Sequence, residues 1–269
     1  MLLIQDLKIK YSNSPKWCID GFSLNARPGE LIIIAGGSGS GKSTLANTII
    51  RLIPIFIRAT IEGKIFIKNK NLNELSRLEL LSHMGYVPQY PGDFTTSIVV
   101  EDEIVFPLEN LQYKPEKIKS CLKDILNQLE INHLRNRLIT ELSSGEIQKV
   151  AIATALIHSP DLLILDEPMA RIDSLSEIRI AEILRSIADK GKTLLIFEHR
   201  LDYLFPFADQ VIYLSDGKIT FKGKPKEIPV HDLEFDLPEV SEIIIPKNKQ
   251  KIVNLNEAKS FLENIFEVS

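Results

Sequence analysis

The chain has 269 residues, of which 44% are hydrophobic and 25% are charged, enough for one large α/β domain or two smaller ones. Its net charge of −4 at pH 7 argues against a nucleic-acid surface as the main partner. No apolar run approaches membrane-spanning length, and charged residues follow Met1 too soon for a signal peptide.

The first part of the chain alternates short β patterns with turn signals. Strands are predicted over 7–11, 22–26 and 61–67, where apolar and polar residues alternate. Residues 31–35 form a wholly apolar run of buried-strand type, and residues 45–50 favour a helix. Tyr11 ends the first predicted strand. It is either a half-buried strand residue or a ring stacked on adenine, and the residues alone leave both interpretations open.

Between the apolar run and the helix lies a loop that fits the phosphate-loop pattern, Gly36-Gly37-Ser38-Gly39-Ser40-Gly41-Lys42-Ser43-Thr44. Its glycines let successive backbone N–H groups point at phosphate oxygens, and the helix adds its positive N-terminal end. Lys42 is expected to reach the β- and γ-phosphates, and the Ser43 hydroxyl to bind Mg²⁺. The alternative is a Gly/Ser-rich linker, which would rarely separate a buried strand from a helix. The loop therefore predicts nucleotide binding.

The rest of the chain alternates predicted helices and buried strands. Helices are predicted over 74–81, 101–106, 116–129 and 174–190, and another opens at Ser143. Residues 162–165 and 193–197 are continuous apolar runs, as in parallel strands buried on both faces. Asp166 and Glu167 follow the first run, at the carboxyl end where α/β sheets bind ligands. Asp216-Gly217 predicts a hairpin.

Taken in order, these features resemble an ATP-binding-cassette (ABC) ATPase over nearly the whole chain. The strand 162–167 resembles the Walker B strand with its catalytic glutamate, Glu167, and Leu142-Ser143-Ser144-Gly145-Glu146 resembles the signature. The remaining matches are Gln89 to the Q-loop glutamine, His199 to the switch histidine, Asp173 to the D-loop aspartate and Tyr11 to the adenine-stacking aromatic.

The resemblance implies a P-loop NTPase fold of the α/β class, with a RecA-like core and an α-helical subdomain. The ATPase domain is expected over 1–224, with its helical subdomain at about 92–158. A small C-terminal domain, with a possible role in dimerisation, is expected over 225–269. The cofactors implied are ATP and Mg²⁺, the metal being held by Ser43, Gln89 and Asp166. Glu167 is expected to act as general base, and His199 to contact the γ-phosphate.

The resemblance also implies that two cassettes close head-to-tail on two ATP molecules, with each signature facing the other chain's phosphate loop. Ser144 and Glu146 depart from the usual glycine and glutamine of the signature. A serine lacks the backbone freedom of glycine, and a glutamate adds negative charge near phosphate. Turnover is expected to survive but to be slowed. Asp173 lies in Ala170-Arg171-Ile172-Asp173, where the family prefers a serine at the first position, so coupling between the two sites is left open.

A closer resemblance is to the ATPases of energy-coupling-factor (ECF) transporters, through the acidic stretch 100–111, the segment 198–202 and the tail around 237–240 and 256–258. It implies a peripheral protein on the cytoplasmic face of the cell membrane. The implied partners are a second ABC ATPase, identical or paralogous, and integral-membrane transporter subunits, with no nucleic acid. The alternatives are the ATPase of an ordinary ABC importer or exporter, and a soluble ABC ATPase without a transport role.

Overall fold

The computed structural model describes residues 1–199 and 203–228, whose strands form two sheets. The smaller is antiparallel with strand order β2-β1-β4-β5, and the larger has the order β10-β9-β3-β8-β7-β6. In the larger sheet β9, β3, β8, β7 and β6 are parallel, and β10 closes one edge as an antiparallel hairpin. The strands are β1 (Leu2–Tyr11), β2 (Ile19–Ala26), β3 (Leu31–Ala35), β4 (Ala59–Ile67), β5 (Lys70–Asn71), β6 (Met84–Val87), β7 (Leu162–Asp166), β8 (Thr193–Glu198), β9 (Gln210–Ser215) and β10 (Lys218–Gly223).

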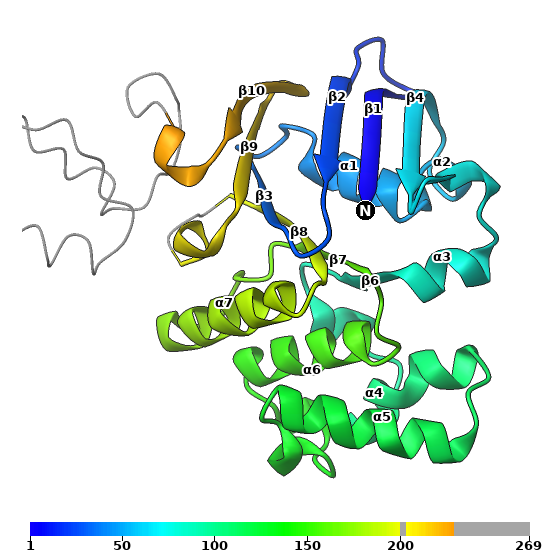
Figure 1. The fold of residues 1–269 in the computed structure, drawn as a ribbon, viewed down its shortest axis with the longest axis vertical. Helices are drawn as coiled ribbons and strands as arrows, with labels where there is room; N and C mark the ends of the chain where they lie inside the picture. The colour runs from blue at the N-terminus through cyan, green and yellow to red at the C-terminus, as the bar shows by residue number, and fades with distance from the viewer. Residues whose placement is uncertain (200–202, 229–269) are drawn as a thin grey trace, which may run out of the picture.

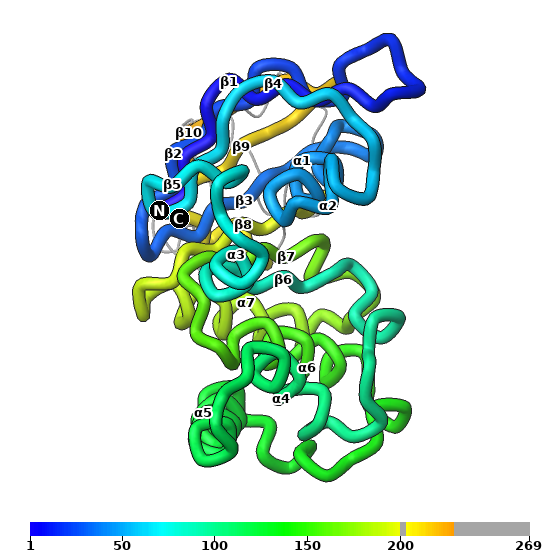
Figure 2. Tube along the Cα trace, turned by 90° about the vertical axis from the view of Figure 1, so that its right-hand side faces the viewer, coloured from blue at the N-terminus to red at the C-terminus, as the bar shows by residue number. Residues whose placement is uncertain are grey.

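The helices divide between the sheets and a separate group. Figure 1 shows α1 beside the antiparallel sheet, α7 alongside the larger sheet, and α4, α5 and α6 together at the opposite end of the molecule. Figure 2 shows the same separation from the side. The helices are α1 (Lys42–Ile49), α2 (Leu52–Ile55), α3 (Arg77–His83), α4 (Val100–Asn110), α5 (Pro115–Gln128), α6 (Ser144–Leu156) and α7 (Ser174–Asp189). Within the described residues, no helix is long and apolar enough to cross a bilayer.

Strand β3 is buried on both faces because it separates two hydrophobic cores. Leu31 and Ile33 belong to the core that includes α4 to α7, and Ile32 and Ile34 to the core under the antiparallel sheet. Successive side chains of a strand point to opposite faces, so a wholly apolar run supplies both cores. Because β3 is packed on both faces, the position of Gly36, which follows it and begins the phosphate-type loop, is well defined.

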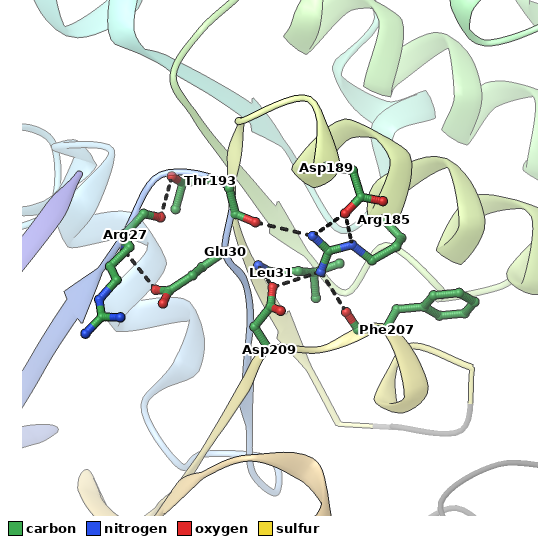
Figure 3. Close-up of polar contacts among 9 residues, drawn as sticks. Arg27, Glu30, Leu31, Arg185, Asp189, Thr193, Phe207 and Asp209 are labelled. Carbon is green, nitrogen blue, oxygen red and sulfur yellow. Dashed lines mark hydrogen bonds and ion pairs between the residues drawn. The ribbon is translucent and has the colours of Figure 1, made fainter. Parts of the chain in front are cut away.

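An arginine on α7 ties the starts of two parallel strands together (Figure 3). The Arg185 guanidinium donates to the Asp209 carboxylate at 2.8 Å and to the Phe207 carbonyl at 3.1 Å, and it pairs with Asp189 at 2.8 Å. Asp209 in turn accepts from the backbone N–H of Leu31 at 2.8 Å. The network anchors the amino ends of β3 and β9, opposite the carboxyl ends where the site lies.

The sequence-based elements agree with the structure except at their ends. The helix predicted over 74–81 is wrong in its bounds, because Ser76 and Glu79 form a capping box that starts α3 at Arg77. The Asp216-Gly217 hairpin is confirmed between β9 and β10. Helices α4 to α6 fall within the range 92–158, but the domain boundaries stay predictions. Segments 200–202 and 229–269, which include most of the expected C-terminal domain, lie outside the described residues.

Candidate functional site

Four parallel strands bring their carboxyl ends to one edge of the larger sheet, and the predicted site residues follow them. Ala35 at the end of β3 is paired with Glu198 at the end of β8, and Asp166 at the end of β7 is paired with Phe197. Strand β6 pairs with β7 and leads into Gln89 two residues after its end. Strand pairing therefore places the phosphate-type loop, the two acids and Gln89 side by side.

The loop between β3 and α1 needs glycine at two positions for different reasons. Gly41 is the N-cap of α1 and has a φ of 106°. A residue with a side chain would be strained in this left-handed conformation. A Cβ added at Gly36 would lie 2.3 Å from the Leu214 carbonyl oxygen. The loop therefore passes close to β9 and then turns sharply into the helix.

Lys42 is buried and folds back over this loop. Its Nζ donates to the carbonyl oxygens of Gly36 at 2.5 Å and Gly37 at 3.0 Å. Burial lowers the Lys42 pKa, an effect opposed by the nearby carboxylates of Glu167, Glu198 and Asp166. The ammonium is thus held by neutral carbonyls among negative charges, in a position that adjoins the cavity described below.

Glu167 is the meeting point of three of the predicted site residues. The side-chain amide of Gln89 donates to the Glu167 carboxylate. The His199 Nδ1 lies 3.8 Å from the same carboxylate and 3.2 Å from the Glu198 carboxylate. The hydrogen bond to Glu198 raises the His199 pKa. The structure therefore brings Gln89, Glu167 and His199 together.

Asp166 lies in a markedly acidic environment at the end of β7. Burial, with the neighbouring charge of Glu167, raises the Asp166 pKa to about 6. Glu198 is 1% exposed, and its carboxylate accepts from the backbone N–H of Met169 at 3.4 Å. Gathering buried acids at one place is unfavourable unless a cation balances them.

Tyr11 and Thr44 join the antiparallel sheet to the phosphate-type loop. The Tyr11 hydroxyl and Thr44 Oγ1 share a hydrogen bond of 2.8 Å, and Cys18 Sγ lies 3.2 Å from the same Thr44 oxygen. Ser43, the residue before Thr44, is exposed. Buried Ser40 has an Oγ without a hydrogen-bond partner. The loop thus presents a free hydroxyl on its surface and another beneath it.

A cavity of about 360 Å³ opens at this edge of the sheet. Its lining contains most of the residues described above, namely Gly36, Gly37, Ser38, Lys42, Gln89, Glu167, His199 and Tyr213. No residue of the segment 142–146 lines it. Within one chain, the structure does not bring the signature-like segment to the phosphate-type loop.

The signature-like segment instead begins α6. Ser143 is the N-cap, and it forms a capping box in which the Ser143 N–H donates to the Glu146 carboxylate at 2.8 Å. Ser144 is the first helical residue, and its φ is not positive. The expectation that serine would lack a backbone freedom needed here is therefore wrong, because a helix start is an ordinary conformation for serine.

Asp173 and Gly145 are linked through one residue of α7. Asp173 caps α7 by accepting from the backbone N–H of Ser176 at 3.0 Å and from its hydroxyl at 2.6 Å. A Cβ added at Gly145 would lie 2.7 Å from the same hydroxyl oxygen. The starts of α6 and α7 are therefore in contact, and residue 145 has room only for glycine.

Sequence reasoning missed two residues that the structure adds to these groups. Glu198 is a buried carboxylate beside His199, and its signal was an acid directly after an apolar strand. Arg137 lies 3.4 Å from Glu146, and only a cation a few residues before the signature could have suggested it.

Comparison with known proteins shows the family of the chain. A family model for the ABC transporter matches residues 19–170. A Pyrococcus abyssi protein named as an ABC transporter ATP-binding protein is 33% identical over 86% of this chain and 83% of its own length. The chain belongs to the ABC transporter family. The cassette is accordingly an ABC ATPase domain, and the expected ABC cassette fold of the P-loop NTPase class is confirmed.

Some relatives of the cassette are much longer than this chain. A Treponema denticola protein named as an ABC transporter ATP-binding protein is 34% identical over 98% of the cassette but only 52% of its own length. A Bacillus subtilis protein named for HMP/thiamine import is 33% identical over 87% of the cassette and 43% of its own length. The cassette thus spans about half the length of several curated relatives.

Solved structures resemble the cassette closely. CbiO1 of Clostridium perfringens, described as part of the ABC transporter complex CbiONQ, has a TM-score of 0.77 at 29% identity and covers 84% of the cassette and 89% of its own chain. A dimeric ATP-binding cassette in a post-hydrolysis state, bound to ADP and Pi, has a TM-score of 0.71 at 27% identity. It covers 85% of the cassette and 100% of its own chain.

Proposed function

We propose that the cassette is the ATP-hydrolysing subunit that powers substrate import across a membrane in an ECF-type ABC transporter. The observation that carries the proposal is the meeting of Lys42, Gln89, Glu167 and His199 around one cavity beneath a glycine-rich loop. A cation, an amide, a carboxylate and an imidazole at the edge of a parallel sheet suit the hydrolysis of a nucleoside triphosphate.

The ECF assignment is supported by two neighbours and by the chain itself. CbiO1 is described as part of the ABC transporter complex CbiONQ, and the Bacillus subtilis relative is named for HMP/thiamine import. The stretch 100–111, which resembles the acidic stretch of ECF ATPases, contains α4 (Val100–Asn110) and its C-cap Leu111, and the first turn of α4 holds Glu101, Asp102 and Glu103. Acidic side chains at a helix N-terminus are stabilised by the helix dipole, so these acids also stabilise the start of α4.

The loop is suited to a triphosphate and its Mg²⁺. Gly36 and Gly41 form a cradle that side chains would fill, and the buried Ser40 Oγ lacks a partner. The described residues contain no group of three or more His, Cys, Asp or Glu side chains that could hold a metal alone. Mg²⁺ commonly takes one or two carboxylates together with substrate phosphates, which agrees with that finding.

The residues that would hold Mg²⁺ are Ser43, Asp166 and Gln89. Burial, with the neighbouring charge of Glu167, raises the Asp166 pKa, and a bound cation would favour the ionised carboxylate. When bound, Mg²⁺ would offset the negative charge of the phosphates. Lys42 would leave its carbonyl partners and pair with phosphate oxygens. The remaining loop residues, Gly37, Ser38, Gly39 and Thr44 among them, would supply backbone N–H groups.

Glu167 would accept a proton from the attacking water, since its carboxylate faces the cavity. His199 would hold the γ-phosphate through the ring nitrogen that does not face Glu198. Gln89 bridges Glu167 and the segment that leads to α4, and it would report the state of the site to that segment. Tyr11 would stack on adenine above Thr44.

A second cassette would complete the site. The signature-like residues Ser143, Ser144, Gly145 and Glu146 lie at the start of α6, away from their own cavity. They would meet the phosphates of a partner's ATP, with the N-terminus of α6 turned to the anion. Asp173 caps α7 at the same contact and would link the two sites. The partner is either a second copy or a paralogous ATPase.

The domain scheme that fits this function is an ATPase domain over 1–224, a helical subdomain at about 92–158 and a C-terminal domain over 225–269 that contributes to dimerisation. The cassette would lie on the cytoplasmic face of the membrane and be held there by integral-membrane transporter subunits. The apolar cavity between α6 and the segment 86–95 includes Phe94, which is 66% exposed, and would receive part of such a subunit.

The test is purification of the tagged chain from its native membranes in mild detergent, with partners identified by mass spectrometry. A second cassette ATPase together with two small, very hydrophobic proteins supports the ECF type. A single pair of permeases contradicts it in favour of an ordinary ABC transporter. Recovery from the soluble fraction alone contradicts a transport role and favours a soluble ABC ATPase.

A further inference from the structure

The segment before the signature is fixed to the start of α4 by backbone pairing. Val99 and Leu138 form an antiparallel bridge, and the Val100 N–H donates to the Arg137 carbonyl at 3.1 Å. Val100 begins α4, which follows the segment after Gln89. The backbone of Arg137 therefore has a defined place between the Q-loop side of the cassette and α6.

The side chain of Arg137 is directed at the first turn of α6. Its Nη1 lies 3.4 Å from Glu146 Oε1, and its Nη2 donates to the Glu141 carbonyl at 2.9 Å. The other Glu146 oxygen accepts from the Ser143 N–H at 2.8 Å. One carboxylate oxygen thus caps the helix while the other faces a guanidinium that is itself held in position.

Glu146 creates an electrostatic difficulty that this contact relieves. Hydrogen bonding from the Ser143 N–H lowers the Glu146 pKa, so the carboxylate is ionised at neutral pH. In the proposed two-cassette site, the start of α6 meets a polyanion, and an uncompensated carboxylate there would repel it. The repulsion would grow as the closing interface excludes water.

We propose that Arg137 is a positioning residue for ATP hydrolysis, which neutralises Glu146 so that a signature with glutamate in place of glutamine can close on the partner's triphosphate. The inference rests on the proposed function, because it needs ATP between two cassettes. Arg137 itself touches neither the reacting atoms nor the cavity of its own chain. Its effect is carried by Glu146.

The experiment is a double-mutant cycle on the complex purified through the tagged full chain, measured as ATP turnover. Arg137→Ala should lower turnover about tenfold when Glu146 is present. In the Glu146→Gln background the same substitution should change turnover less than about twofold, because no charge remains to be neutralised. Arg137→Lys keeps the positive charge but not the paired N–H donors of the guanidinium, so its turnover should lie between those of wild type and Arg137→Ala. ATP binding to the chain's own loop should stay unchanged in all of them.

Two results would overturn the inference. One is an unaltered turnover in Arg137→Ala, and the other is an equal loss in both backgrounds, which would assign Arg137 to the fold through Glu141. If the alanine variant cannot be purified, Arg137→Gln gives the same comparison, because it keeps a donor for the Glu141 carbonyl. A wild-type complex that hydrolyses no ATP would overturn the proposed function itself, so the two failures are distinguishable.

Discussion

The side-chain amide of Gln89 donates a hydrogen bond to the carboxylate of Glu167, joining the segment after β6 to the residue after β7. The next residue, Tyr90, places its ring 4.2 Å from the guanidinium carbon of Arg171, in the segment that leads to Asp173. Two successive residues after β6 thus contact the expected base and the segment that leads to Asp173. If the Gln89 side chain were to hold Mg²⁺, its hydrogen bond to Glu167 would be lost.

Lys42 is expected to supply much of the affinity for nucleotide. Lys42→Ala should weaken ATP binding about tenfold to a hundredfold, because charge-assisted hydrogen bonds to phosphate are lost. Isothermal titration measures the affinity, and thermal unfolding checks that losing the bonds to Gly36 and Gly37 leaves the fold in place. Lys119→Ala on the exposed side of α5 is the matched control. Equal affinities in the two variants would refute the phosphate role.

Two substitutions of Tyr11 distinguish a ring that stacks on adenine from an ordinary strand residue. If the ring stacks on adenine, Tyr11→Ala weakens ATP and ADP binding by about 1–3 kcal/mol, and Tyr11→Phe does not. Tyr11→Phe removes the hydrogen bond to Thr44 and should lower stability by about 0.5–1.5 kcal/mol. An alanine variant that loses stability but binds nucleotide normally would leave Tyr11 as an ordinary strand residue.

Gly145 has no space for a side chain beside Ser176. Gly145→Ala would place a Cβ 2.7 Å from the Ser176 Oγ and 3.0 Å from its Cβ, so the Ser176 side chain, which caps α7 with Asp173, must shift. Turnover of the purified complex should fall at least about tenfold, while binding to the chain's own loop is kept. Adding Ser176→Gly removes both contacts and should restore part of the rate. No recovery would mean that the clash is not the cause.

The ion pair between Glu101 and Arg135 gives a stability effect with a defined pH dependence. Two hydrogen bonds of 2.6 and 2.8 Å from Arg135 lower the Glu101 pKa. A carboxyl group whose pKa is lower in the folded than in the unfolded state stabilises the fold at pH values above its unfolded-state pKa. This contribution is lost as the pH falls through the folded-state pKa. Arg135→Ala should therefore cost about 0.5–1 kcal/mol at pH 7 and nothing well below pH 4. Denaturant unfolding in a Glu101→Gln background, where no further loss is expected, is the control.

The sequence predicted buried strands at 31–35, 162–165 and 193–197 because continuous apolar runs are typical of strands buried on both faces, but it did not predict their order in the sheet. It also placed Asp166 and Glu167 directly after the apolar run 162–165, and the structure brings Gln89 and His199 to Glu167. Periodicity and motif spacing are enough to predict the place of a site residue that directly follows a buried strand.

Contacts between distant side chains could not be predicted in this way. The start of α3 depends on the reciprocal bonds of Ser76 and Glu79, which propensity alone did not locate. The Arg137–Glu146 and Tyr90–Arg171 contacts join residues that are far apart or lie on different elements, and their relative position depends on the packing of the helices. The serine at position 144 was judged by analogy with glycine, whereas the structure places it in ordinary helix.

The most direct test of the proposed catalytic site is ATP turnover by the complex purified through the tagged chain, with wild type compared with Glu167→Gln. The variant should still bind ATP and retain it. Its turnover should fall at least by half if the second cassette has its own base, and by more than about a hundredfold if both cassettes are this chain. A Glu167→Gln complex that releases phosphate at the wild-type rate would contradict the assignment of Glu167 as base, and with it the proposed catalytic site.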